Sequence, residues 1–195
     1  MAQILIIIEG PVLSGKTTVS RKIRESKKHV QLFAPSGLCS YFTMNKLHIN
    51  YLKTVYRSKF KFDEQVYVLE RSLFTNYIYF NEFLNKSNLS QIEKALLRKS
   101  FNKDLHYYVK LLKKCKKKFN DIIYVSLTID EHEIPERVEK ALNEKHGFFA
   151  YSVDEVSKQA NKYLLLETYI EEVLKDSVRI LSIKSNEYDR IFETK

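Results

Sequence analysis

The sequence has 195 residues, of which 44% are hydrophobic and 29% are charged. This length and composition suit a single domain over residues 1–195 with a sizeable core. No apolar run is long enough to span a bilayer, and no basic segment precedes the first apolar run, so we expect no membrane segment and no signal peptide. The net charge of +9 permits a polyanionic partner. We expect a soluble, cytoplasmic protein whose cysteines, Cys39 and Cys115, stay reduced.

The first predicted strand, residues 3–9, leads into a loop that fits the pattern G-x-x-x-x-G-K-[ST] and opens a predicted helix over residues 17–26. With the residue that follows it, the loop comprises Gly10, Pro11, Val12, Leu13, Ser14, Gly15, Lys16, Thr17 and Thr18. Glycines let backbone N–H groups point at phosphate oxygens, and the helix adds its positive dipole end. In this pattern the lysine reaches the β- and γ-phosphates and the hydroxyl binds Mg²⁺. We therefore expect Lys16 and Thr17 to bind ATP and Mg²⁺.

Further apolar, β-branched runs alternate with helical patterns along the chain. Continuous apolar runs suit strands that are buried on both faces. The alternation predicts an α/β fold, a five-stranded parallel sheet with helices on both sides and a ligand beyond the carboxyl ends of the strands. The remaining predicted strands are residues 29–34, 65–70, 121–129 and 178–183, and a long helix is predicted over residues 153–175.

Five lysines crowd into residues 113–118, and two readings of them are open. Apolar residues from Phe101 to Phe119 recur at spacings of four and three, which predicts an amphipathic helix with the lysines largely on its solvent side. A basic cluster can also bind nucleic acid. The sequence favours the solvated face, and nucleic acid is not an expected partner.

Glu70-Arg71-Ser72 stands at the carboxyl end of the third predicted strand. The carboxylate of Glu70 can hold Mg²⁺, and the guanidinium of Arg71 fits phosphate oxygens and can offset charge during phosphoryl transfer. The alternative is an ion pair that ends a strand, with Ser72 as a helix N-cap. Beside a phosphate-binding loop, the catalytic interpretation is favoured.

Several segments together resemble two related kinase families. Ile8-Glu9-Gly10, Glu70-Arg71-Ser72 and residues 77–80 resemble the deoxynucleoside kinases, whereas residues 34–37 and the Tyr163-to-Glu167 stretch resemble the thymidylate kinases. The resemblance covers nearly the whole chain and implies a three-layer P-loop kinase fold with a lid, ATP and Mg²⁺ as cofactors, and a small nucleoside or nucleotide as substrate. Dimers are common in both families, so the resemblance leaves a homodimer open.

The acceptor depends on a departure from the resembled pattern. Ala34 stands where deoxynucleoside kinases carry the glutamate that resembles a general base. A phosphate acceptor is already anionic, so Ala34 favours a deoxynucleoside monophosphate, with thymidylate as the leading expectation. Glu70 or Glu9 could stand in as the base, which leaves a nucleoside 5′-hydroxyl as the alternative. A different kind of function is also open: a nucleotide-binding regulator or nucleic-acid-associated protein that keeps the loop but lacks efficient phosphoryl transfer.

The resemblance also implies substrate-binding and lid residues. Glu9, Arg57 and Asn76 are expected to bind the acceptor, although Arg57 and Asn76 suit a helix surface equally well. The lid is expected over residues 131–151, where Arg137 would stabilise developing charge. Other lid arginines of the family are missing, with Lys140 and Lys145 as partial substitutes and Gly147 as a hinge.

Overall fold

The computed structural model describes residues 2–34, 40–143 and 151–193. Within them, five parallel strands form one sheet in the order β2-β3-β1-β4-β5. The predicted sheet is confirmed, with strand ends that differ by one or two residues. The strands are β1 (Ala2–Glu9), β2 (Val30–Phe33), β3 (Glu64–Glu70), β4 (Asp121–Leu127) and β5 (Arg179–Ile183).

Helices connect these strands, and several begin at a serine cap. Ser40 and Ser72 accept hydrogen bonds from backbone N–H groups in the first turns of their helices, while Ser90 and Ser152 form capping boxes with Glu93 and Glu155. The helices are α1 (Lys16–Ser26), α2 (Tyr41–Arg57), α3 (Leu73–Lys86), α4 (Gln91–Cys115), α5 (Ile134–Asn143) and α6 (Val153–Leu174), with short 3₁₀ segments η1 (Glu131–Glu133) and η2 (Ser185–Phe192).

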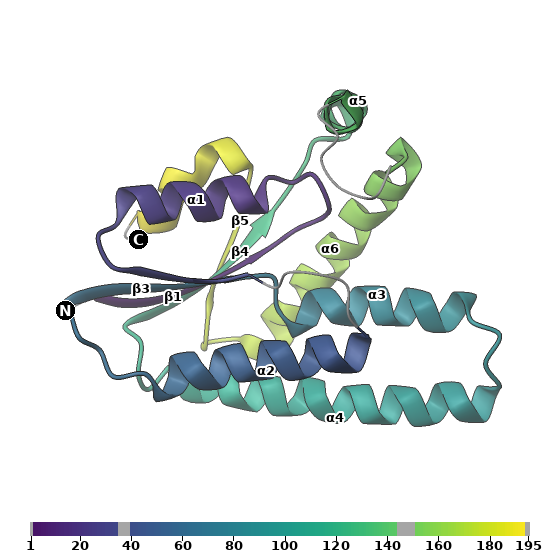
Figure 1. Cartoon of the computed structure of the whole chain (residues 1–195), viewed down its shortest axis with the longest axis horizontal. Coiled ribbons are helices and arrows are strands. Elements are labelled where there is room, and N and C mark those ends of the chain that lie inside the picture. The colour runs from purple at the N-terminus through teal and green to yellow at the C-terminus, as the bar shows by residue number, and fades with distance from the viewer. Residues whose placement is uncertain (1, 35–39, 144–150, 194–195) are drawn as a thin grey trace.

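The sheet separates two helical layers (Figure 1). On one face, α1 and η2 cover a core that includes Ile6 and Ile8 of β1. On the other, α2, α3, α4 and α6 pack over a larger core that includes Leu5 and Ile7. Alternate residues of β1 thus enter opposite cores, which is why the strand is apolar without interruption.

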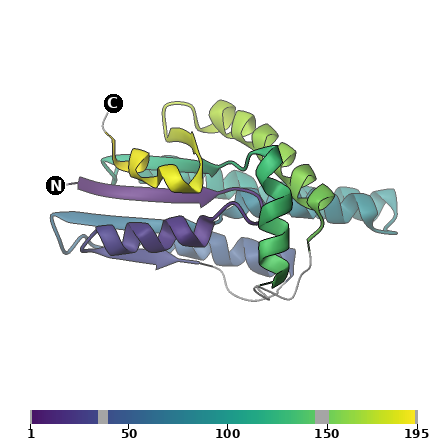
Figure 2. The same ribbon diagram turned by 90° about the horizontal axis from the view of Figure 1, so that it is seen from above.

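The parallel arrangement brings the carboxyl ends of β1, β3 and β4 to one edge of the sheet. Seen from above, α5 lies across this edge, over the loop that follows β1 (Figure 2). Side chains at these strand ends are therefore placed to meet beneath α5. Separately, none of the described helices is both long and apolar enough to cross a membrane.

Candidate active site

Two glycines shape the phosphate-binding loop between β1 and α1. Gly10 has φ +147° and Gly15 has φ +88°, which is backbone that L-residues rarely adopt. A Cβ at Gly10 would lie 2.7 Å from the Leu127 carbonyl oxygen, and one at Gly15 would lie 2.7 Å from Cβ of Ser185. Leu13 is also left-handed, with φ 64°. The glycines therefore allow both the turn and its close approach to β4 and η2.

Lys16, the first residue of α1, folds back over this loop. Its Nζ donates hydrogen bonds to the carbonyl oxygens of Gly10 (2.8 Å) and Pro11 (2.5 Å) and to Oγ of Ser14 (3.3 Å). Burial, with a contribution from the nearby charge of Arg71, lowers the pKa of Lys16 to about 7. An anion bound in the loop would favour the charged amine and raise this pKa again. Lys16 is thus held at the loop, and its binding of ATP stays a prediction.

Thr17 and Glu70 meet although they come from different elements. The Thr17 hydroxyl, on the exposed side of α1, donates to Oε1 of Glu70 at the end of β3 over 2.7 Å. A hydroxyl and a carboxylate oxygen at this separation are ligands that Mg²⁺ prefers. The donor set therefore fits the metal proposed from the sequence. Thr18, the next residue, is exposed on α1.

Arg71 follows Glu70 in left-handed backbone, with φ 69°, and its N–H donates to the carbonyl oxygen of Ile8 over 2.9 Å. This turn ends β3 before Ser72 caps α3. The charge of Arg71 helps to lower the pKa values of Lys16 and His48, which places its guanidinium near both. Among the described residues, no hydrogen bond or ion pair occupies that guanidinium. It can therefore bind an anion beside Lys16.

Arg137 joins the predicted lid helix α5 to the phosphate-binding loop. Its guanidinium donates to the Leu13 carbonyl oxygen and to Oε2 of Glu133, each over 2.9 Å. Gln159 of α6 accepts a hydrogen bond from the N–H of Val12 over 3.1 Å. Residues from both helices thus contact the loop. The segment 35–37 and residues Cys39, Lys145 and Gly147 lie outside the described residues.

Glu9 is fully buried at the end of β1. Its two carboxylate oxygens accept hydrogen bonds from Oγ of Ser72 (2.5 Å) and from the hydroxyl of Thr75, to which the Tyr163 hydroxyl donates over 3.2 Å. Burial raises the pKa of Glu9, while these hydrogen bonds and the charge of Lys16 lower it. Glu9 thus fastens β1 to the start of α3 and is enclosed on all sides, below the loop rather than in an open cleft.

Asn76 lies on the buried side of α3 against α2. Its amide donates to the Tyr41 carbonyl oxygen over 2.8 Å and to Oδ1 of Asn45, and the Asn45 amide donates to Asp104 of α4 over 3.1 Å. Both donor hydrogens of Asn76 are therefore engaged within the protein, and its carbonyl oxygen is left as the group that could contact a ligand.

Arg57 is not brought to this site. It is the last residue of α2 and is exposed. The helix starts near the carboxyl edge of the sheet and runs back toward the amino ends of the strands (Figure 1). At about 1.5 Å per residue, seventeen residues carry the chain about 25 Å. The expected helix is present, but its length places Arg57 at the far end.

Two buried polar residues of α2 near the site were not predicted from the sequence. Asn45 is fully buried, and His48 is 4% exposed, where burial and the charge of Arg71 lower its pKa to about 4. Both occupy the helix face that also buries Ile49 and Leu52. A polar pair on an otherwise apolar helix stripe is the pattern that could have identified them.

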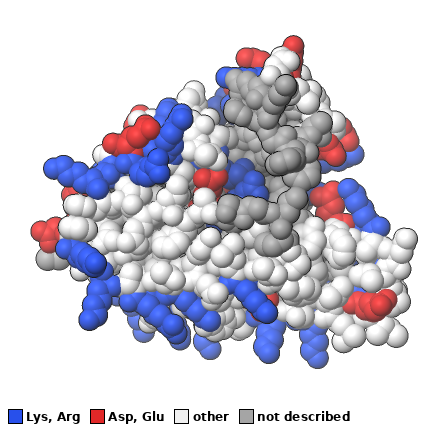
Figure 3. Space-filling view, viewed as in Figure 1, with Lys and Arg blue, Asp and Glu red and all other residues white. Residues whose placement is uncertain are grey.

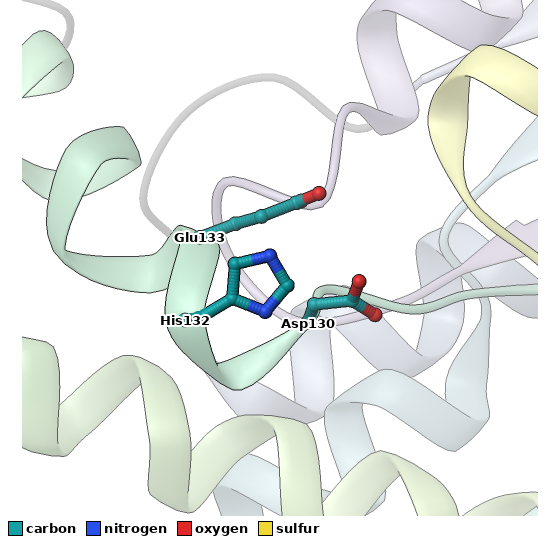
Figure 4. A group of neighbouring side chains, drawn as sticks. All are labelled: Asp130, His132 and Glu133. Carbon is teal, nitrogen blue, oxygen red and sulfur yellow. The ribbon is translucent and has the colours of Figure 1, made fainter.

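The turn into α5 holds a further group of ligand-type side chains. Asp130, His132 and Glu133 have candidate ligand atoms within 4.8 Å of one another (Figure 4). Lys184 forms ion pairs with Asp130 and Glu133, and Arg137 pairs with Glu133. These carboxylates therefore already neutralise two cations, and they fasten Arg137 beside the loop.

No protein-family model and no curated protein matches the sequence significantly. Solved structures do share the fold. A polyphosphate kinase 2 from Arthrobacter aurescens superposes with a TM-score of 0.60 at 15% identity over 96% of this chain, which spans 63% of that protein. The YorR protein of Bacillus subtilis, in complex with phosphorylated GDP, gives 0.53 at 18% identity, with 96% of this chain and 90% of that chain covered.

The deoxyadenosine kinase of M. mycoides with bound dATP gives a TM-score of 0.52 at 18% identity, with 93% of this chain and 91% of that chain covered. These identities are low, and what the structures share with this chain is the fold. The chain has the α/β fold of the P-loop nucleoside and nucleotide kinases.

Proposed function

We propose that the protein transfers the γ-phosphoryl group of ATP, with Mg²⁺, to a deoxynucleoside monophosphate, with thymidylate as the leading candidate. One observation carries the proposal: the groups needed for phosphoryl transfer converge at the carboxyl edge of the sheet. Lys16 lies on the loop, Thr17 contacts Glu70, and Arg137 contacts the loop from α5. Binding a nucleotide alone would not require this whole set.

Each residue has a distinct part in the proposed reaction. Backbone N–H groups of residues 10–17 and the amine of Lys16 hold the donor phosphates. Thr17 and Glu70 would hold Mg²⁺, which when bound offsets phosphate charge. Arg71 and Arg137 stabilise the charge that develops on the transferred group.

In the reaction itself, an oxygen of the acceptor phosphate forms a bond to the γ-phosphorus. The bond from that phosphorus to the bridging oxygen breaks, and ADP leaves.

The state of Glu9 supports an acceptor that is already ionised. Its carboxylate is enclosed and accepts two hydrogen bonds, so it is not placed to take a proton from an acceptor. Ala34 at the end of β2 offers no base. A phosphate acceptor needs none, because its attacking oxygen carries no proton to remove.

A nucleoside 5′-hydroxyl is the second candidate acceptor, and one observation favours it. Glu70 accepts a hydrogen bond from the hydroxyl of Thr17 over 2.7 Å. Accepting a proton from a bound hydroxyl is what a general base does in this reaction. If Glu70 takes that part, its replacement by glutamine abolishes transfer to nucleosides at every Mg²⁺ concentration.

A panel assay tests the proposal. The protein is incubated with ATP, Mg²⁺ and, separately, the deoxynucleosides and their monophosphates of all four bases, and the products are separated by chromatography. We expect a diphosphate product, and none from the Lys16→Ala variant. Products from nucleosides alone would replace the proposed acceptor by the second candidate. No product across the panel would contradict both candidates and favour a nucleotide-binding regulator. The lid offers one arginine among the described residues, Arg137, which is consistent with that alternative.

A further inference from the structure

The net positive charge of the protein is concentrated on two neighbouring helices. Helices α2 and α4, with the three lysines that follow α4, carry thirteen basic and two acidic side chains, a net +11. The whole chain carries +9, so the remaining residues together are net −2. The two helices and the lysines after α4 therefore supply the net positive charge, because acidic and basic residues nearly balance over the rest of the chain.

Along α4 and the turn after it, five lysines and one histidine form one continuous row. Residues spaced alternately by four and three lie on the same side of a helix. The row runs for about 27 Å at 1.5 Å per residue. Its exposed members are Lys99, Lys103, His106, Lys110, Lys113 and, in the turn after the helix, Lys117.

Helix α2 adds a second row beside the first. Lys46, Lys53 and Arg57 are spaced by seven and four residues, and so they share one side of α2. The two helices touch through Lys53, whose Nζ lies 5.2 Å from the ring centre of Tyr107 on α4. We call the two rows together the α2–α4 basic face. Figure 3 shows Lys and Arg gathered along this lower edge of the molecule.

The cations of this face have no anionic partner among the described residues. Elsewhere, described lysines and arginines on α1, α3, α5, α6, β5 and η2 pair with carboxylates. Within the described residues, no ion pair involves a lysine or arginine of α2 or α4. Asp104 instead accepts from Asn45, and Glu93 closes the cap at Ser90. The charge of the face is therefore not compensated within the described chain.

We infer that the α2–α4 basic face binds a double-stranded nucleic acid through its phosphate backbone, without reading the bases. Nearly all its cations are lysines, which act as point charges on phosphates rather than as the planar forks that read guanine. Packed helices lie about 8–10 Å apart, so the two rows spread charge over a width that suits the two phosphate backbones of a duplex better than the one backbone of a single strand.

The test is the salt dependence of binding to a fluorescent DNA duplex of about 20 base pairs. If the five α4-row lysines contact phosphates, a plot of log affinity against log salt has a slope of about −4.5. The variant Lys99→Gln, Lys103→Gln, Lys110→Gln, Lys113→Gln should reduce the magnitude of that slope by about 3.6, at about 0.9 per contact. A thermal melt checks that this variant folds.

A matched control removes the same number of charges elsewhere. Arg21, Lys86, Lys158 and Arg190 are exposed and paired with carboxylates, and we expect their fourfold replacement by glutamine to leave the slope unchanged. Equal loss in the two variants would show that only net charge matters and would overturn the inference. No duplex binding at low salt, or binding to inorganic polyphosphate but not to the duplex, would also overturn it.

Discussion

The carboxyl edge of the sheet and the α2–α4 basic face both gather positive charge, but they hold it in opposite ways. At the edge, Lys16 is 6% exposed and hydrogen-bonded to backbone carbonyl oxygens, and Arg137 is fixed by Leu13 and Glu133. On the basic face, the α4-row lysines are exposed and have no carboxylate partner among the described residues. Buried, fixed cations can act on one atom of a ligand, whereas exposed ones act over a surface and are screened by salt.

The largest effect that this comparison predicts is at Lys16. Lys16→Ala should lower kcat by a factor on the order of 10³ or more, because it removes a cation fixed beside the transferred phosphate. Circular dichroism and a thermal melt should show an intact fold. A variant that keeps the wild-type rate would remove Lys16 from the mechanism.

Thr17 and Glu70 should determine the Mg²⁺ concentration that the reaction requires. Glu70→Gln and Thr17→Val should each raise the Mg²⁺ concentration required for half-maximal rate, since each removes a proposed oxygen ligand or its charge. A magnesium titration of the initial rate measures the shift. Glu187→Gln, which changes a carboxylate paired with Arg190 on η2, is the control and should leave the titration unchanged. Identical magnesium titrations for the wild-type protein and all three variants would show that Thr17 and Glu70 do not hold the metal.

The lowered pKa of Lys16 predicts a pH dependence of ATP binding. Free Lys16 has a pKa of about 7, and bound phosphate raises it. Above pH 7 the free amine loses its proton and must regain it on binding, so affinity should fall about tenfold per pH unit between about pH 7.5 and 9.

Calorimetric titration over that range measures the effect. Lys16→Arg keeps its charge throughout and should give a flatter profile. A flat profile in the wild-type protein would show that Lys16 is already charged before ATP binds.

The smallest expected effect separates the two regions. Replacing Lys99, Lys103, Lys110 and Lys113 by glutamine should change kcat/KM for phosphoryl transfer by less than about twofold, because salt screens exposed charges that do not touch the site. No hydrogen bond or ion pair among the described residues links these lysines to it. Steady-state kinetics at physiological ionic strength is the measurement. A large loss would show that the two regions act together.

Local patterns in the sequence predicted the sheet, the phosphate-binding loop and the meeting of Thr17 with Glu70. Apolar runs define buried strands, and parallel strands bring their carboxyl ends to one edge. Positions that depend on helix length and on side-chain partners were not predictable. Arg57 lies at the far end of α2 because the helix runs on to that residue, and Asn76 directs its amide to Asn45 and Tyr41.

The two rows of the basic face show the same limit. The sequence predicts that the lysines near residue 115 face solvent, and the structure places Lys113, Lys114, Lys116 and Lys117 there. The sequence does not reveal that α2 lies alongside α4 and extends the charged surface, because contact between two helices is a matter of tertiary structure. Nor does the sequence show the ion pairs that join separate segments, such as Lys162 with Glu82 and Arg179 with Asp121.

Transfer of labelled γ-phosphate from ATP to thymidylate, measured side by side for the wild-type protein and Lys16→Ala in the presence of Mg²⁺, tests the central proposal most directly. We predict labelled thymidine diphosphate from the wild-type protein and none from the variant. Equal labelling by both proteins, or no labelled product from the wild type with any deoxynucleoside monophosphate, would contradict the proposed function.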